Sequence, residues 1–176
     1  RRMADGEKLV GKKIGVTSVA VQQMLGVHQP DFEFLTDAMM YPDGGEVPLS
    51  GNSILPRAEG EIAFKLKSDL RGPGVTNADV LAATDKVYPC FEIVDSRVKD
   101  WKIKIQDTVA DNASCHSLVL GGQGVSPHDV DLVTCGMVIE KNGQLLSTGA
   151  GAAALGSPVN CVTWLANTLG SLGIPL

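Results

Sequence analysis

The alternation of apolar and polar residues predicts a chain rich in strands. In Glu61–Lys67, Ile62, Phe64 and Leu66 alternate with polar or small neighbours, which is typical of a half-buried strand. Similar alternating or continuous apolar runs predict strands in the segments Lys12–Thr17, Lys86–Asp95, Val98–Gln106, Leu132–Glu140 and Gln144–Ser147. Pro89 indicates an edge or a bulge in its strand, because proline has no N–H to donate. Asn142-Gly143 predicts a type I′ hairpin turn between the last two strands.

Capping residues mark three helices. Ser18 can cap a helix that runs to about Leu25 and is stopped by Gly26. Thr76 can cap a helix over Asn77–Thr84, with Asp79 at the capping-box position. Ser157 and Pro158 begin a last helix. Its apolar face comprises Val159, Val162, Leu165, Ala166 and Leu169.

Residues 28–45 contain two prolines, three aspartates and two glycines, and we expect a long irregular connection there. Strands outnumber helices, and no internal repeat or low-complexity segment interrupts them. The pattern therefore predicts an α+β fold with a mixed, mostly antiparallel sheet, in one domain over residues 1–176.

Composition excludes several classes of protein. The 176 residues carry 15 Lys+Arg against 20 Asp+Glu, a formal net charge of −5, and 5% aromatic residues. This balance argues against a nucleic-acid partner, which would need a basic surface or stacking aromatics. No apolar run approaches the ~20 residues of a membrane span, and no signal peptide opens the chain.

Cys90, Cys115, Cys135 and Cys161 show no zinc-ligand spacing. We expect reduced, buried thiols and a cytoplasmic location. Residues 142–176 contain no charged side chain, which is unusual for a solvated surface. We expect this region to form core and a subunit interface, and the protein to be a homo-oligomer.

Three glutamates are the strongest candidates for a functional site. Glu59 and Glu61 project to one face of a strand, where they repel each other unless a cation or water intervenes. For this pair alone, a solvated strand end is the competing interpretation. Glu92 lies in an apolar stretch where an unpaired carboxylate is costly to bury. Together the three would make a hard-oxygen site for Mg²⁺ or Mn²⁺.

Other candidates are weaker. Lys13 sits in an apolar strand and could pair with these acids or transfer a proton, although a surface lysine fits the pattern equally well. Residues 107–114 are rich in small hydrogen-bonding groups that could contact a carboxylate ligand or only form turns. The string Gly149–Ala154 matches a dinucleotide motif but follows a hairpin, so we reject that interpretation. No hydrolytic triad is indicated.

Several motifs in order resemble one family. They are Gly11–Ser18 (GKKIGVTS), Gly26–Met39 (GVHQPDFEFLTDAM), Arg57–Phe64 (RAEGEIAF), Glu92–Arg97 (EIVDSR), Asp100–Lys102 (DWK) and Gln106–Ser114 (QDTVADNAS). The chain resembles the bacterial 2-hydroxypenta-2,4-dienoate hydratases and their sister 4-oxalocrotonate decarboxylases, of the fumarylacetoacetate hydrolase superfamily. Residues 26–39 favour the hydratase branch, and Cys115-His116 departs from the small residues expected there.

The resemblance implies a fold like the fumarylacetoacetate hydrolase C-terminal domain, and Mg²⁺ or Mn²⁺ held by Glu59, Glu61 and Glu92. Hydration of 2-hydroxypenta-2,4-dienoate would give 4-hydroxy-2-oxopentanoate in the degradation of aromatic compounds. Lys13 and Asp37 would be catalytic, and Gln106 and Ser114 would bind substrate.

Family members carry an N-terminal helical segment and closing C-terminal strands, so the resemblance implies a chain truncated at both ends. We expect such a chain to be poorly soluble by itself. The alternatives are a 4-oxalocrotonate decarboxylase and a non-catalytic partner subunit of a hydratase–decarboxylase complex.

Overall fold

A four-stranded sheet forms the centre of the molecule. The computed structural model describes residues 2–49, 51 and 53–176. The strand order is β3 (Met40–Tyr41), β6 (Cys115–Leu120), β5 (Thr84–Val94) and β4 (Arg57–Leu66). The short β3–β6 pair is parallel and the β6–β5 and β5–β4 pairs are antiparallel. The predicted mixed, mostly antiparallel α+β fold is therefore confirmed.

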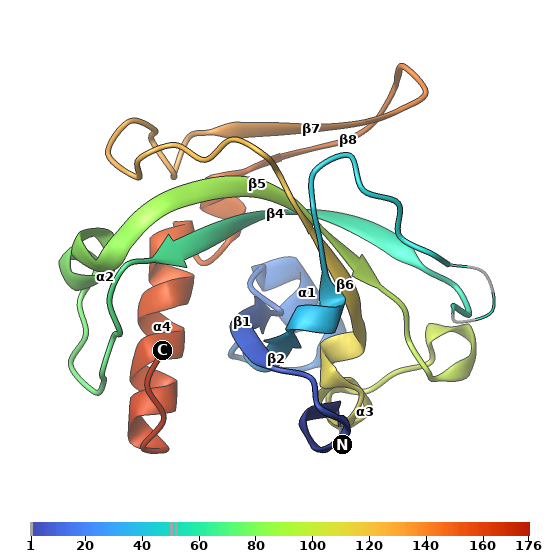
Figure 1. Ribbon diagram of the computed structural model, residues 1–176, viewed down its shortest axis with the longest axis horizontal. Coiled ribbons are helices and arrows are strands. Elements are labelled where there is room, and N and C mark those ends of the chain that lie inside the picture. The colour runs from blue at the N-terminus through green and yellow to red at the C-terminus, as the bar shows by residue number, and fades with distance from the viewer. Residues whose placement is uncertain (1, 50, 52) are drawn as a thin grey trace.

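A second, two-stranded sheet lies under the arch that β4 and β5 form (Figure 1). Its strands are β1 (Leu9–Gly15) and β2 (Asp31–Thr36), and α1 (Val19–Leu25) joins them. Ser18 caps α1 by accepting the N–H of Val21, and Gly26 ends it in the left-handed conformation, as the sequence predicts. This arrangement directs the inner side chains of β1 and β2 toward β4 and β5.

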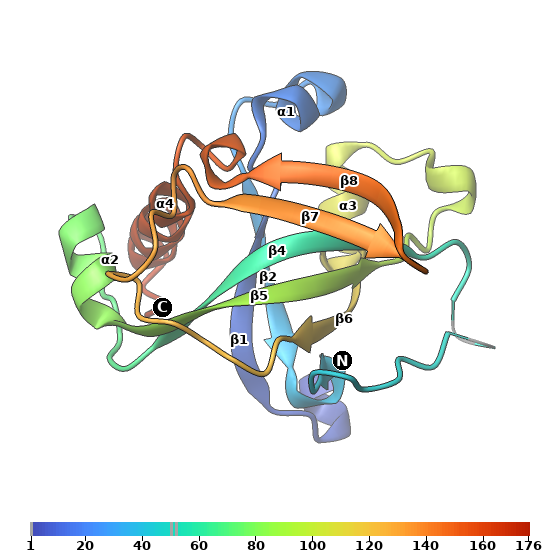
Figure 2. The ribbon, with the colours of Figure 1, turned by 90° about the horizontal axis from the view of Figure 1, so that it is seen from above.

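The hairpin of β7 (Gly136–Lys141) and β8 (Gln144–Ala150) crosses the other face of the arch (Figure 2). Asn142 and Gly143 both have positive φ, as the predicted type I′ turn requires. The hairpin approaches β4 at Gly60, where an added Cβ would meet the Met137 sulfur at 2.3 Å. A glycine is needed between the two glutamates for this close contact.

The main hydrophobic core lies between the sheet and two helices, α2 (Asn77–Ala83) and α4 (Pro158–Ser171). Thr76 and Asp79 form the predicted capping box of α2. Ser157 caps α4, and the face predicted for that helix is buried. No helix among the described residues is long and apolar enough to cross a membrane.

Two expectations were wrong. Residues 28–45 are not irregular, because β2, the 3₁₀ turn Asp37–Met39 and β3 lie within them. In β2 the buried positions Asp31 and Glu33 are acidic and the phenylalanines between them are less buried. A search for strands with apolar residues on the inner face therefore does not detect it. Val98–Gln106 is not a strand either: it forms the 3₁₀ turn Lys99–Trp101 and the start of α3 (Ile105–Ala110). Four alternating residues are too few to exclude helical turns.

The remaining elements are short. The largest boundary errors are four residues, because β4 begins at Arg57 and not at Glu61, and β7 begins at Gly136 and not at Leu132. The 3₁₀ turns Arg2–Asp5, Asn112–Ser114 and Gly151–Ala153 complete the chain. Pro89 is paired within β5, and it lies where pairing with β6 stops: its carbonyl accepts the N–H of Gly121. Pairing on that side resumes at the bridge between Val87 and Val125, so the proline lies at an interruption in the pairing and not at a free edge.

We expect Leu165→Ala in α4 to lower the free energy of unfolding by about 2–5 kcal/mol, because a buried leucine leaves a cavity when truncated. Leu165 is 2% exposed and Leu172, at the end of the same helix, is 61% exposed. Leu172→Ala is the matched control and should change the free energy by less than ~0.5 kcal/mol. Urea unfolding measures both. Equal losses in the two variants would show that α4 is not anchored through this face.

Candidate metal and proton-transfer site

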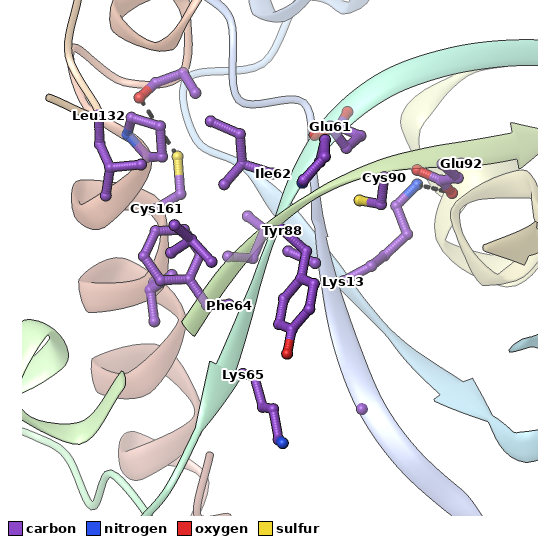
Figure 3. A pocket seen from close by; sticks show the side chains of 18 of the residues that line it. Lys13, Glu61, Ile62, Phe64, Lys65, Tyr88, Cys90, Glu92, Leu132 and Cys161 are labelled. Atoms are coloured by element: carbon purple, nitrogen blue, oxygen red, sulfur yellow. Dashed lines mark hydrogen bonds and ion pairs between the residues drawn. The ribbon is translucent and has the colours of Figure 1, made fainter. Parts of the chain in front are cut away.

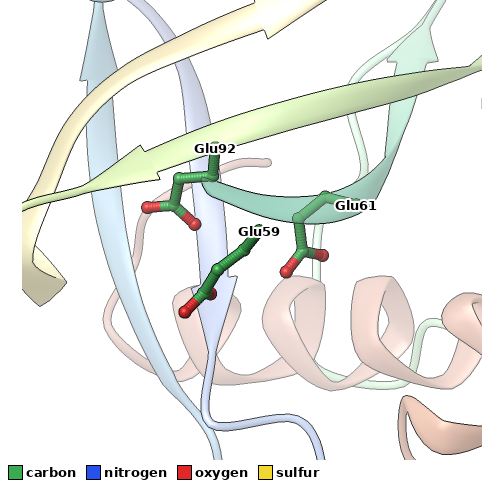
Figure 4. A group of neighbouring side chains, drawn as sticks. All are labelled: Glu59, Glu61 and Glu92. Carbon is green, nitrogen blue, oxygen red and sulfur yellow. The ribbon is translucent and has the colours of Figure 1, made fainter. Parts of the chain in front are cut away.

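Three glutamates meet on the inner face of the β4–β5 pair (Figure 4). Glu59 on β4 is directly opposite Glu92 on β5, and Glu61 follows two residues along β4 on the same face. One ligand oxygen from each carboxylate lies within 4.8 Å of the others. Strand pairing alone therefore brings together the three side chains that the sequence singled out, and their oxygen atoms could hold one metal ion.

The three carboxylates repel one another. Glu92 is 3% exposed, whereas Glu59 reaches solvent at the end of the cluster. Burial, followed by the charges of Glu92 and Glu59, raises the pKa of Glu61 to about 7. The pKa of Glu59 is also raised, by burial and then by Glu92. A divalent cation between them would remove this repulsion, and that is the electrostatic signature of a metal site.

Lys13 supplies the positive charge of the cluster. Its Nζ donates a hydrogen bond to Glu92 Oε1 at 2.5 Å, and its side chain is 12% exposed. Burial alone would lower the pKa of Lys13, but the charge and hydrogen bond of Glu92 reverse this, and the pKa lies above its usual value. Lys13 is thus a buried ammonium group bound to one member of the carboxylate cluster.

Asp31 and Glu33 extend the cluster, and the sequence interpretation missed them. In the β1–β2 pair Glu33 is opposite Lys13 and Asp31 is opposite Gly15. Asp31 lies so close to β1 that a Cβ on Gly15 would meet its Oδ1 at 2.2 Å. Both acidic residues are 8% exposed. The alternation of Asp31, Glu33 and Leu35 with two phenylalanines is the signal that could have revealed a strand with acidic residues inside.

Burial is the largest influence on the pKa values of Asp31 and Glu33. It raises the pKa of Asp31, and the nearby charge of Lys13 partly offsets the rise. Burial and the charge of Asp31 raise the pKa of Glu33 to about 7. Neither oxygen of Asp31 has a well-formed hydrogen bond within the described residues. Such burial stabilises the protonated form of a carboxyl group relative to the ionised form.

A cavity of about 1120 Å³ opens beside the cluster (Figure 3). Lys13, Glu61 and Glu92 line one end of it, and Cys90 lies between them and the apolar end. The apolar end is lined mainly by Ile62, Phe64, Leu132, Cys161 and Leu165. A small molecule with a charged head and an apolar tail fits this division.

The other residues predicted for the site lie elsewhere. Asp37 is exposed at the start of its 3₁₀ turn, where Oδ1 accepts the N–H groups of Lys8 and Ala38 at 3.0 Å each. Gln106 is exposed on α3. Ser114 is 1% exposed and donates its hydroxyl to Asp111 Oδ2 at 2.9 Å. None of the three lines the cavity, so their roles stay predictions.

The buried cysteines are unsuited to nucleophilic catalysis. All four are free thiols, and all but Cys135 are buried. Burial, with the charges of Glu61 and Glu92, raises the pKa of Cys90 to about 12. Its thiol is therefore protonated at neutral pH and is not a nucleophile.

Comparison with known proteins agrees with this geometry. No family model matches the chain. A 2-hydroxypent-2,4-dienoate hydratase of Pseudomonas putida is 76% identical over 174 residues, which cover 99% of this chain and 78% of that protein. A 2-hydroxyhexa-2,4-dienoate hydratase of Comamonas testosteroni is 62% identical over 99% of this chain, and the match covers 66% of that relative.

Solved structures share the fold. The 4-oxalocrotonate decarboxylase of Pseudomonas putida G7, in complex with magnesium and adipate, superimposes with a TM-score of 0.95 at 44% identity, over all of this chain and 66% of that one. A fumarylacetoacetate hydrolase of Exiguobacterium antarcticum superimposes with a TM-score of 0.68 at 13% identity, which shows the fold alone. The chain therefore belongs to the 2-hydroxypentadienoate hydratase family, within the fumarylacetoacetate hydrolase fold.

Proposed function

We propose that this protein is a metal-dependent hydro-lyase that converts 2-hydroxypenta-2,4-dienoate to 4-hydroxy-2-oxopentanoate. The observation that carries the proposal is the group of Glu59, Glu61 and Glu92 with Lys13 bound to Glu92, inside a chain 76% identical to a hydratase. Because the chain spans about two thirds of several of its relatives, the activity of the whole protein is part of the proposal.

The carboxylate cluster fits a hard divalent cation. Three carboxylate oxygens from two strands leave coordination positions for water and substrate, as Mg²⁺ and Mn²⁺ require. The magnesium in the related decarboxylase structure supports this assignment. Such an ion supplies Lewis-acid stabilisation for the negative charge that develops at the C2 oxygen of the substrate.

Lys13 and Asp31 are suited to move the proton. The Lys13 ammonium lies at the cavity beside Glu92, where it can bind the C1 carboxylate or deliver a proton. Asp31 lies nearby on β2 and does not line the cavity, and burial raises the pKa of its carboxyl group. We infer that Lys13 exchanges a proton with the substrate and that Asp31 replenishes it.

The enol hydroxyl loses its proton and C5 gains one, which leaves a 2-oxo acid with a double bond between C3 and C4. Water adds at C4 and its second proton goes to C3, giving 4-hydroxy-2-oxopentanoate. The charged end of the cavity, where Lys13 lies, would hold the substrate carboxylate.

Two alternatives remain in the proposal. A decarboxylase would need a cation for a second substrate carboxylate, and the lower identity to the decarboxylase, 44% against 76%, favours the hydratase. A non-catalytic subunit would keep an interface without turnover. All seven residues of β8 are exposed and uncharged, which supports a subunit contact in a homo-oligomer or with a decarboxylase. The free cysteines fit the cytoplasm.

We expect the dienol absorbance of 2-hydroxypenta-2,4-dienoate to disappear in the presence of the protein and Mg²⁺ or Mn²⁺, with a product one water heavier by mass. A chelator and Glu61→Gln should each abolish the reaction, since both remove charge stabilisation at the C2 oxygen. Glu140→Gln, on the exposed hairpin, is the matched control. Loss of CO₂ from 4-oxalocrotonate with the dienol unchanged would instead identify a decarboxylase.

Metal affinity should rise with pH. Because the pKa of Glu61 is about 7, binding a cation must displace a proton from it below neutral pH, and the raised pKa of Glu59 acts in the same direction. We expect the dissociation constant for Mn²⁺ to increase by up to ~10-fold per pH unit for each proton displaced as pH falls from 7 to 5. Calorimetry in two buffers of different ionisation enthalpy counts the protons released. Equal affinity at pH 5 and pH 8 would contradict the raised pKa values.

Lys13→Met should separate proton transfer from metal binding. The loss of a positioned proton donor predicts a fall in kcat of about 10²–10⁴-fold. Mn²⁺ affinity should be kept or increased, because Glu92 loses its competing partner. Lys141→Met on the hairpin turn is the control. A Lys13→Met variant with unchanged kcat would remove Lys13 from the mechanism.

A further inference from the structure

We propose that Asp95 and Trp101 form a clasp that positions Glu59 by fixing the backbone of Ile54 and Leu55 just before β4. The inference rests on the proposed metal site, because its function is to hold one of the three carboxylates in place. Neither Asp95 nor Trp101 lines the cavity. Both are therefore positioning residues that act through the strand.

Asp95 holds the segment by two backbone groups. Its Oδ2 accepts the N–H of Ile54 at 2.8 Å and its Oδ1 accepts the N–H of Leu55 at 2.7 Å. The Asp95 side chain is itself fixed, because the residue is 3% exposed and its own N–H donates to the carbonyl of Ser114 at 2.8 Å. A buried carboxylate with both oxygens bonded to successive N–H groups defines the direction of that chain.

Trp101 holds the same segment from the other side. Its indole Nε1–H donates to the carbonyl of Leu55 at 3.0 Å, and its ring lies under the guanidinium of Arg57 at 4.3 Å from the centroid. Three backbone groups in two residues are thus bound by two side chains from the segment that follows β5. Since Arg57 is paired with Val94, the clasp also closes the end of the β4–β5 ladder.

Apolar packing does not fix this segment. Ile54 is 61% exposed and Leu55 is 52% exposed, so their side chains bury little surface. The three hydrogen bonds and the cation–π contact of Arg57 remain to hold the chain where β4 begins.

Glu59 depends on this support more than the other two carboxylates. Glu92 is buried and bound to Lys13, whereas Glu59 is exposed and accepts no hydrogen bond in the described part of the chain. It lies two residues after Arg57, near the open end of the ladder. Its oxygen atoms can be held near those of Glu61 and Glu92 only by the backbone from which the side chain extends.

The test is the dissociation constant of Mn²⁺, measured by electron paramagnetic resonance of the free ion in the unsubstituted protein, Asp95→Asn, Glu59→Gln and the double variant. The amide introduced by Asp95→Asn keeps one acceptor oxygen and directs its NH₂ group at the other backbone N–H. Loss of a support for a ligand typically costs 10–100-fold in affinity, and we expect about 10-fold here. In the double variant we expect no further loss beyond that of Glu59→Gln, because the clasp acts through Glu59.

Two further variants provide a second test of the clasp and a control. Trp101→Phe removes the donor to Leu55 and part of the ring under Arg57, and it should weaken binding by about threefold even if Asp95→Asn folds poorly. Asp129→Asn is the control, since Asp129 is exposed and does not line the cavity. Two results would overturn the clasp. One is a double variant in which the losses of Mn²⁺ affinity from Asp95→Asn and Glu59→Gln multiply. The other is a Mn²⁺ affinity of both Trp101→Phe and Asp95→Asn that equals that of the unsubstituted protein. If Glu59→Gln itself leaves the affinity unchanged, the metal site fails instead.

Discussion

The ion pair between Lys13 and Glu92 joins the two sheets of this molecule, and the acidic site is arranged around it. Five carboxylates, Glu59, Glu61, Glu92, Asp31 and Glu33, share the electrostatic field of this one buried lysine. One ammonium cannot neutralise five ionised acids in a weakly solvated interior. The structure responds by raising the pKa of four of them, so that protons, or a divalent cation, supply the missing positive charge.

This constraint explains why the acids lie on two separate pairs of strands. Glu59, Glu61 and Glu92 come from the β4–β5 pair and converge because β-strand side chains alternate and cross-strand partners share a face. Asp31 and Glu33 come from β2, across Lys13 from the first group. The lysine therefore separates a group suited to a metal from a group suited to protons.

The sequence predicted the parts of this arrangement that depend on local periodicity. Ser18, Thr76 and Ser157 cap their helices because capping is decided within four residues, and Asn142-Gly143 determines its own turn. Glu59 and Glu61 were found because their strand has apolar neighbours. Asp31 and Glu33 were missed because the inner face of β2 is acidic. A segment with polar residues at alternate positions and no apolar face is interpreted as a loop unless its partner strand is known. Lys13 on β1 lies opposite Glu33 and supplies the positive charge that this acidic face needs. The sequence alone does not show that the two residues are paired.

The same limit applies to Val98–Gln106, where alternation over four residues gave a strand and the structure has turns. Those turns bring Trp101 back to Leu55, a contact over 46 positions that no local pattern contains. Asp95 likewise reaches residues 40 and 41 positions away. Family motifs at these positions stood out in the sequence without a chemical role. The polar groups of Asp95 and Trp101 bind the backbone that leads into the strand of Glu59. Asp95 and Trp101, two motif residues outside the cavity, are therefore explained by their hydrogen bonds to the residues just before β4, the strand that carries Glu59.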